Sequence, residues 1–201
     1  MNKILSSKWT KVVVFLLGLG PLAALVWFGY KLQLTANPLE YITHYTGDWT
    51  LRFLMITLAV TPLRVMLNRP AVTKFRRMLG LFTFFYAFLH LLTWIWFVNG
   101  FDVMAMWDDV AMRLYITVGM AGFLAMVPLA VTSTTGWVKR LGFKRWQKLH
   151  TLIYAAGIAG VLHYVWLVKS DIREPLLYGA ILAGLLGFRL AVRLKRSTAS
   201  R

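Results

Sequence analysis

Long uncharged apolar stretches alternate along the chain with short segments that carry most of its charge. Four of these stretches have roughly the 17 to 25 residues that a helix needs to cross a hydrocarbon layer. Two further stretches are shorter and reach the length of a span only if basic residues near their ends are included. The long side chains of these residues can reach the headgroup layer. The pattern predicts an all-α membrane protein, with a six-transmembrane-helix bundle in one domain. The predicted spans are about 12–30, 48–67, 78–98, 114–134, 149–168 and 175–194.

Composition supports this class of protein. Hydrophobic residues make up 59% of the 201 residues and charged residues only 15%, and the mean hydropathy is +0.62, which is too apolar for a soluble globular protein. The N-terminus resembles a secretory signal, but its apolar run continues to Tyr30, so we expect a retained helix. Cysteine is absent, which excludes disulfides, thiolate metal sites and cysteine catalysis.

The basic residues flank the spans unevenly. Of the 23 Lys and Arg residues, 18 fall on the side that would hold both termini, whereas all seven acidic residues fall on the other side. Because Lys and Arg are enriched in cytoplasmic loops, we predict an N-in, C-in topology. The net charge of +16 is spread over four membrane-flanking segments, which favours anionic lipid over nucleic acid as its partner. The 18 residues are Lys3, Lys8, Lys11, Arg64, Arg69, Lys74, Arg76, Arg77, Lys139, Arg140, Lys144, Arg145, Lys148, Arg189, Arg193, Lys195, Arg196 and Arg201.

Three of the four histidines lie within predicted spans. His90 lies in the third span, and His150 and His163 lie in the fifth. An ionisable group in a membrane is costly to bury and needs a partner, so it is a functional candidate. A neutral imidazole bonded to a neighbouring helix is the simplest alternative for one such residue, but three in two spans favour a shared ligand. His44 precedes the second span and is interpreted as a surface or interfacial residue.

The third and fifth spans run in the same direction from basic flanks, so the depth of each histidine can be estimated. At about 1.5 Å per residue, His90 lies roughly 20 Å beyond Arg77, and His163 lies roughly 22 Å beyond Lys148. His150 lies only about 3 Å beyond Lys148. Two imidazoles at matching depth can take both axial positions of a haem. We therefore predict His90 and His163 as axial ligands and place His150 at the cytoplasmic edge.

Several basic residues are candidates for holding anionic groups of a cofactor. Arg52, Arg76 and Arg77 are candidate partners of haem propionates. Arg145 and its basic neighbours are candidates for a flavin phosphate, although a role in topology is the simpler explanation.

Other uses of the histidines fit less well. A structural zinc site requires four protein ligands. Proton pumps usually employ acidic residues within the membrane, and this chain has none in the middle of any predicted span. A copper site of His and Met stays open. So do two functions of a different kind, a transporter or channel lined by the membrane histidines and a non-redox docking scaffold.

Five stretches resemble one known family. They are NPLEYITHYTG at 37–47, ITLAVTPLR at 56–64, RRMLGL at 76–81, LAVTSTTGWVKRLGFKRWQKLHTLIY at 129–154 and HYVW at 163–166. Over nearly its whole length the chain resembles the MsrQ family, formerly YedZ, the haem-binding membrane subunits of the bacterial MsrPQ methionine sulfoxide reductase system. That family is similar to the transmembrane part of ferric reductases and NADPH oxidases.

The resemblance implies an electron-transfer subunit, not itself catalytic, in the bacterial inner membrane. It implies haem b, as one haem or two, and FMN as cofactors. Electrons would come from the quinone pool or a cytosolic flavin reductase and pass to a periplasmic molybdopterin subunit, MsrP, which reduces methionine sulfoxide in proteins. The resemblance assigns the haem-iron ligands to His90, His150 and His163.

Two departures from the oxidase relatives matter. Those relatives carry two histidines on each of the corresponding helices, whereas the third span here has only His90, so the second ligand at His150 stays open. They also append a cytosolic flavin and nicotinamide domain, for which this chain has no residues. We therefore expect electrons to arrive from another molecule.

Overall fold

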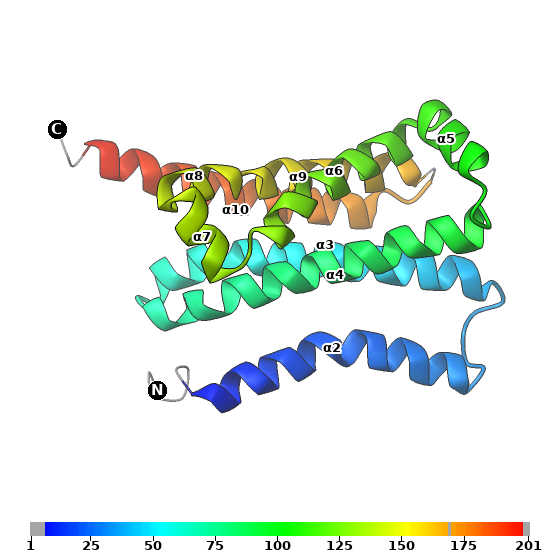
Figure 1. Ribbon diagram of the computed structural model, residues 1–201, viewed down its shortest axis with the longest axis horizontal. Coiled ribbons are helices and arrows are strands. Elements are labelled where there is room, and N and C mark those ends of the chain that lie inside the picture. Colours follow the sequence, from blue (N-terminus) through cyan, green and yellow to red (C-terminus); the bar gives the residue numbers. More distant parts are fainter. Residues whose placement is uncertain (1–6, 169, 199–201) are drawn as a thin grey trace.

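The computed structural model describes residues 7–168 and 170–198. Within these ranges the fold is helical and has no strand, and six helical stretches are long and apolar enough to cross a membrane. The prediction of an all-α bundle with six membrane-spanning helices is therefore confirmed. The helices run side by side, with α2 at one side of the bundle and both chain termini at the same end (Figure 1). Lys3 and Arg201, counted above among the basic flanks, lie outside the described residues.

The first four spanning stretches come from the N-terminal two thirds of the chain. They are α2 (Lys8–Tyr30), α3 (Pro38–Met66), the 3-10 helix η1 (Pro70–Phe75) continued by α4 (Arg76–Thr93) and the π-helix η2 (Trp94–Val98), and α6 (Leu114–Val131). Helix α3 begins well before the predicted second span, because the Asn37 side chain accepts a hydrogen bond from the Glu40 amide and Pro38 suits the first turn.

The remaining helices complete the bundle and its connections. The last two spanning stretches are α8 (Phe143–Leu149) with α9 (Leu152–Leu167), and α10 (Arg173–Thr198). Two short helices, α5 (Val103–Met112) and α7 (Thr135–Leu141), connect the spans. The fifth stretch is broken at His150 and Thr151, which lie in a turn between α8 and α9. The break places His150 at the end of one helix and His163 well inside the next.

Helix α3 lies at the centre of the packing. It packs extensively against α4, while α6 packs extensively against α9, and α10 contacts both α3 and α9. Three buried clusters fill the space between these helices, one of them mostly aromatic. The clusters are Leu51, Leu54, Met55, Leu58, Val161 and Leu182; Phe53, Phe82 and Tyr86; and Ala87, Met126 and Ala156. Large apolar side chains elsewhere face outward, for example Leu17 and Trp27 of α2, as expected where lipid is the solvent.

Helix α2 is joined to the bundle through Tyr86 of α4. Pro21 interrupts the hydrogen-bond ladder of α2. The Tyr86 hydroxyl donates to the Gly18 carbonyl at 2.9 Å and accepts from the Leu22 amide at 3.1 Å. These two backbone groups would bond to each other in an uninterrupted helix, so the hydroxyl is inserted at the bend and satisfies both. Tyr86 lies one turn before His90, and this contact helps to fix α4.

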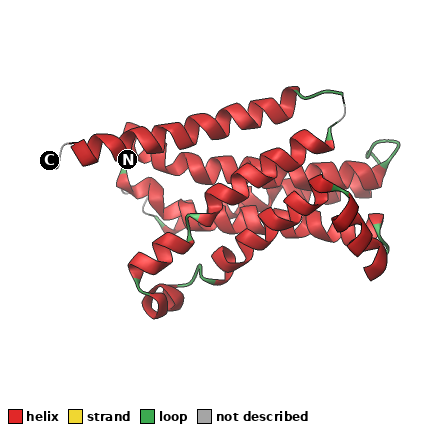
Figure 2. Cartoon of the chain, turned by 90° about the horizontal axis from the view of Figure 1, so that it is seen from above, coloured by secondary structure: helices red, strands yellow, loops and turns green. Residues whose placement is uncertain are grey.

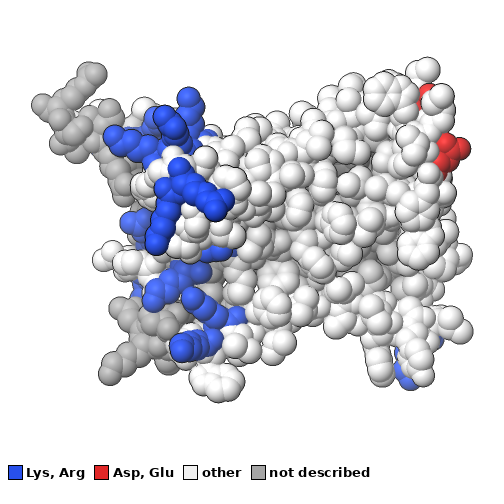
Figure 3. Space-filling model, in the orientation of Figure 1, with Lys and Arg blue, Asp and Glu red and all other residues white. Residues whose placement is uncertain are grey.

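The two ends of the bundle differ in charge. Figure 3 shows most Lys and Arg at the end that holds the chain termini, and Asp and Glu at the opposite end, where fewer basic residues are visible. We call these the basic end and the acidic end. Figure 2, seen from a perpendicular direction, shows the long helices running between the two. The basic end includes η1, α7, α8 and the last turns of α10, and the acidic end includes α5 and the start of α10.

Candidate functional site

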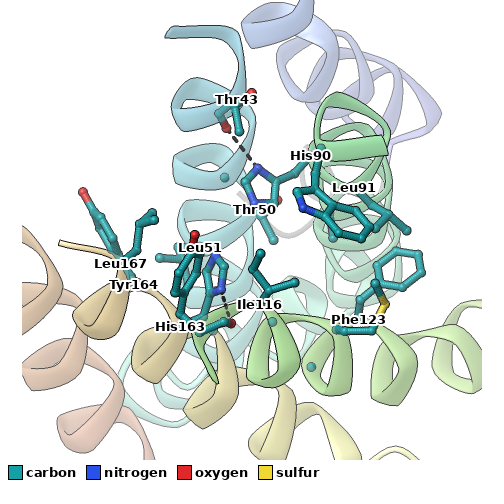
Figure 4. Close-up of a pocket in the computed structure, with 18 of the residues that line it drawn as sticks. Thr43, Thr50, Leu51, His90, Leu91, Ile116, Phe123, His163, Tyr164 and Leu167 are labelled. Atoms are coloured by element: carbon teal, nitrogen blue, oxygen red, sulfur yellow. Dashed lines mark hydrogen bonds between the residues drawn. The ribbon is translucent and has the colours of Figure 1, made fainter. Parts of the chain in front are cut away.

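A cavity of about 320 Å³ lies between α3, α4, α6 and α9, toward the acidic end. We call it the acidic-end cavity. His90 and His163 project into it from different helices (Figure 4). Their ring centroids are 6.0 Å apart, and the ring planes are nearly perpendicular at 81°. The structure therefore brings together the two histidines that lie at matching depth in the sequence.

Each of these imidazoles bonds to a backbone carbonyl through Nδ1. The Nδ1 atom of His90 is 3.0 Å from the Thr43 oxygen, and that of His163 is 2.7 Å from the Tyr115 oxygen. A carbonyl can only accept, so each Nδ1 carries the proton and donates it. The Nε2 atom then keeps its lone pair, which is the state in which a neutral imidazole binds a metal.

A glycine of a neighbouring helix faces each ring. A Cβ atom on Gly119 would lie 2.6 Å from Nδ1 of His163, and one on Gly47 would lie 3.2 Å from Nδ1 of His90. Both carbonyls that accept from the histidines lie four residues before these glycines, one helical turn away. Each histidine ring therefore packs against a glycine and bonds to the carbonyl that lies one helical turn before that glycine. Sequence reasoning missed these glycines, because their role depends on contacts between helices.

The acidic-end cavity fits a haem better than a bare metal ion. Two metal–nitrogen bonds of about 2 Å, with about 1 Å from each nitrogen to its ring centre, would place two ligating imidazoles roughly 6 Å apart, which matches the observed 6.0 Å. No cluster of three or more His, Cys, Asp or Glu residues that could hold an ion occurs among the described residues. A haem brings its own ring of nitrogen donors. Its apolar macrocycle suits walls formed by Leu51, Ile116 and Phe123.

Arg113 lies at the rim of this cavity and is its one arginine in the described structure. Its Nε atom is 3.1 Å from Asp109, and Nη1 donates to the Tyr115 hydroxyl at 3.4 Å. The hydrogen bond to Tyr115 and the charge of Asp109 raise the pKa of Arg113 above its ordinary value. Asp109 also accepts from the Trp94 indole at 3.3 Å. Sequence reasoning missed Arg113, because its position before the fourth span resembles that of any flanking charge.

A second cavity, of about 440 Å³, lies toward the basic end, and we call it the basic-end cavity. His150 lines it, with Nδ1 3.1 Å from the Trp146 oxygen and the ring 4.0 Å from the Trp146 ring. The Nε2 atom is buried and has no hydrogen-bond partner in the described structure. His150 and His163 thus face different cavities, and the break between α8 and α9 separates them.

The arginines predicted to hold anionic groups divide into two sets. Arg76 and Arg77 line the basic-end cavity, together with Arg189 of α10, which the sequence pattern identified only as a flanking charge. Arg52 lines neither cavity. It lies 3.9 Å from Asp48 and donates to the Tyr178 hydroxyl at 3.3 Å. Arg145 is an exposed residue of α8 that also lines neither cavity.

A thin layer of side chains separates the two cavities. Met126 lines both of them, Phe123 lines the acidic-end cavity, and Phe84 lines the basic-end cavity. The rings of Phe84 and Phe123 are stacked, with centroids 5.5 Å apart and an angle of 20° between the planes. The cavities are therefore neighbours across one partition, formed by α4 and α6.

Comparison with known proteins gives two kinds of match. The family described as "Ferric reductase like transmembrane component" matches residues 46–161. This segment includes His90, His150 and Tyr115, and it ends just before His163. No solved structure matches the chain.

Several relatives carry the name "Protein-methionine-sulfoxide reductase heme-binding subunit MsrQ". The protein of Bordetella pertussis is 47% identical over 193 residues, which cover 95% of this chain and 93% of that protein. The protein of Herminiimonas arsenicoxydans is 50% identical over 182 residues, covering 90% and 84%. That of Rhodospirillum rubrum is 50% identical over 192 residues, covering 93% and 91%.

Proposed function

Because the chain belongs to the MsrQ family of heme-binding subunits of protein-methionine-sulfoxide reductase, we propose that it holds haem b in the acidic-end cavity and carries electrons across the membrane. It is a multi-pass membrane protein of the ferric-reductase-like group. One observation carries the proposal. His90 and His163 face each other across an apolar cavity at 6.0 Å, and each has its Nδ1 atom bonded to a carbonyl.

The histidines would serve as the axial ligands through their Nε2 atoms. When bound, haem supplies one-electron redox chemistry. The carbonyls of Thr43 and Tyr115 fix the orientation of the rings, and the hydrogen bond that each accepts from Nδ1–H makes the ring more basic. A more basic axial ligand favours the oxidised iron and so lowers the reduction potential. These carbonyls would therefore help to make the site an electron donor.

Other residues of the cavity would exclude water and receive the polar edge of the cofactor. Leu51, Leu54 and Phe123 present apolar surface, which keeps the surroundings dry. Arg113 at the rim would pair with a propionate, since guanidinium and carboxylate form strong bidentate hydrogen bonds.

The charge of the two ends supports an orientation. With the basic end in the cytoplasm of a bacterial cell, both termini are inside and the acidic-end cavity lies near the periplasmic face of the inner membrane. Electrons would leave from this cavity to a periplasmic molybdopterin subunit, MsrP, which reduces methionine sulfoxide in proteins. The acidic loops would form part of the surface on which that subunit docks.

The basic-end cavity would hold an inner redox centre near the electron donor. His150 offers an unpaired Nε2 atom, and Arg76 and Arg77 offer positive charge. A second haem b or FMN is the cofactor proposed for this position, and the quinone pool or a cytosolic flavin reductase is the proposed donor. Arg52 and Arg145, which line neither cavity, have no part in this scheme.

Visible spectroscopy of the purified protein tests the proposal. Protein from haem-replete cells should show a Soret band that shifts on reduction with dithionite, and a pyridine haemochrome assay should identify haem b. A colourless protein would overturn the proposal and favour a histidine-lined transporter or a docking scaffold. Reduction by quinol compared with reduced flavin distinguishes the donors. Reoxidation by MsrP with methionine sulfoxide then tests the direction of transfer.

A further inference from the structure

Arg189 is a guanidinium inside the basic half of the bundle. It belongs to α10, and its side chain reaches between α3 and α9. Nη1 donates to the Tyr154 hydroxyl at 3.0 Å, Nη2 donates to the Leu58 carbonyl at 2.7 Å, and the guanidinium lies 5.4 Å from the Tyr154 ring centroid. The Nε atom is buried and has no hydrogen-bond partner in the described structure.

One of these bonds has a local explanation. Leu58 lies four residues before Pro62, which is inside α3 and has no N–H to offer, so the Leu58 carbonyl lacks its helical donor. Inside a membrane such a carbonyl must find another donor. Arg189 supplies it. A neutral donor would serve equally well, so this bond explains the position of the side chain but leaves its positive charge unexplained.

No acidic residue neutralises that charge. All seven acidic residues are described and belong to the other half of the molecule, and none of the ion pairs in the described structure includes Arg189. Asp48 precedes Leu58 by ten positions on the same helix, which is about 15 Å of helix. Arg189 is partly buried, and a cation held there inside a membrane without a counter-charge is unfavourable. The acidic residues are Glu40, Asp48, Asp102, Asp108, Asp109, Asp171 and Glu174.

The surroundings of Arg189 add to the positive charge. Arg189 lines the basic-end cavity with Arg76 and Arg77, and His150 lines it as well. No Asp or Glu lines this cavity in the described structure, whereas Asp48 lines the acidic-end cavity. Apolar side chains line the same cavity, among them Phe84 and Leu129. The cavity thus combines cations with apolar surface.

We propose that the basic-end cavity binds a ligand with an apolar body and an anionic carboxylate or phosphate group, and that Arg189 is the cation that pairs with this group. Arg76 and Arg77 lie where they strengthen the same attraction. Three molecules offer this chemistry: haem through a propionate, FMN through its phosphate, and a phospholipid through its headgroup. For haem and FMN the inference rests on the proposed function, which it extends by assigning Arg189 to the site. For a phospholipid it does not depend on that function.

Replacing Arg189 removes both the charge and the bond to Leu58, so two comparisons are needed. Arg189→Met is compared with Arg193→Met, which removes the same charge from an exposed position one turn further along α10. Pro62→Ala with Arg189→Met is compared with Pro62→Ala alone. In this second pair the alanine at 62 returns an N–H to the Leu58 carbonyl, so the two proteins differ in the charge and not in that backbone bond.

The measurement is the amount of haem, flavin and anionic phospholipid retained per protein after purification. Both Arg189→Met proteins should retain roughly tenfold less of one of the three ligands, because the loss of one partner leaves the other charge unpaired. The ligand lost identifies the anionic group. The low-spin signal of the acidic-end haem should persist in both.

Two outcomes would overturn the inference. One is that Arg189→Met in the Pro62→Ala background retains all three ligands as well as Pro62→Ala alone. The other is a uniform loss of every ligand together with the acidic-end haem signal in that pair, which would reveal general destabilisation. A colourless wild-type protein would contradict the proposed function but would still leave the flavin and phospholipid measurements to decide this inference.

Discussion

The two cavities differ in what holds their polar groups. In the acidic-end cavity, two imidazoles are each oriented by a backbone carbonyl and each pack against a glycine. In the basic-end cavity, a single imidazole packs against the tilted ring of Trp146, and three arginines supply charge. The first arrangement fixes two lone pairs relative to each other. The second arrangement places positive charge beside an apolar wall.

This difference indicates two modes of binding within one bundle. Preorganised ligands favour a metal centre whose coordination is set before the cofactor arrives. Clustered arginines recognise anionic groups, and they tolerate more variation in the body of the ligand. We therefore expect substitutions near the acidic-end cavity to change coordination and potential, and substitutions near the basic-end cavity to change occupancy.

The largest effect should come from removing an axial ligand. His163→Ala, or His90→Ala, should abolish the low-spin haem spectrum, because the iron then lacks its sixth ligand. His150→Ala should leave that spectrum in place, since His150 faces the other cavity. Reduced-minus-oxidised spectra and electron paramagnetic resonance report the change. Persistence of the low-spin signal in both the His90 and His163 variants would refute the pairing.

A smaller effect should follow from filling the glycine positions. In Gly119→Ala the new Cβ would lie 2.6 Å from the His163 ring, so the ring must move, at a cost of about 1 to 3 kcal/mol. In Gly47→Ala the contact with His90 is 3.2 Å, so the shift should be smaller. Electron paramagnetic resonance and haem content should rank Gly119→Ala above Gly47→Ala.

Gly184 provides the control for these two substitutions, because a Cβ atom there would meet nothing within 4 Å. Gly184→Ala should match the wild-type protein in spectrum and haem content. A spectrum unchanged in Gly119→Ala, or changed equally in Gly184→Ala, would contradict the view that the bare helical turn sets the position of the ring.

The smallest effect should come from a substitution at the rim of the acidic-end cavity. Arg113→Gln removes a positive charge beside the acidic-end cavity and should lower the reduction potential, because a nearby cation favours the reduced iron. Arg113 is half exposed, so solvent screens its charge, and the shift should be less than about 40 mV. Arg173→Gln, at an exposed position of the same end, is the control. A potentiometric titration measures both, and a rise in potential for Arg113→Gln would contradict this placement of the cation.

The depth of each residue along its span could be predicted from the sequence, because the rise per residue of a helix is fixed. The six spans follow from this regularity, and so does the common level of His90 and His163. Family membership, expected from the motifs, is confirmed by relatives that are about half identical over most of the chain.

The rotation of each helix about its axis, and its packing against the other helices, could not be predicted in the same way. Arg113 and Arg189 appear in the sequence as flanking charges, and only the contacts between helices place them at cavities. Arg52 shows the converse, since a suitable charge near a span end instead pairs with Asp48 on its own helix. The break at His150 could not be predicted either, because no proline or glycine lies next to it in the sequence. Each of these features depends on which face of a helix meets a neighbour, and apolar spacing specifies that face poorly when most sides of the helix are apolar.

Met126 belongs to the walls of both cavities, and its flexible side chain can yield to a ligand on either side. A molecule that displaces it from one cavity takes volume from the other. Occupancy of the two sites is then thermodynamically coupled, and the coupling has the same magnitude in both directions. Binding of a ligand in one cavity would thus change the affinity of the other cavity through the Met126 side chain.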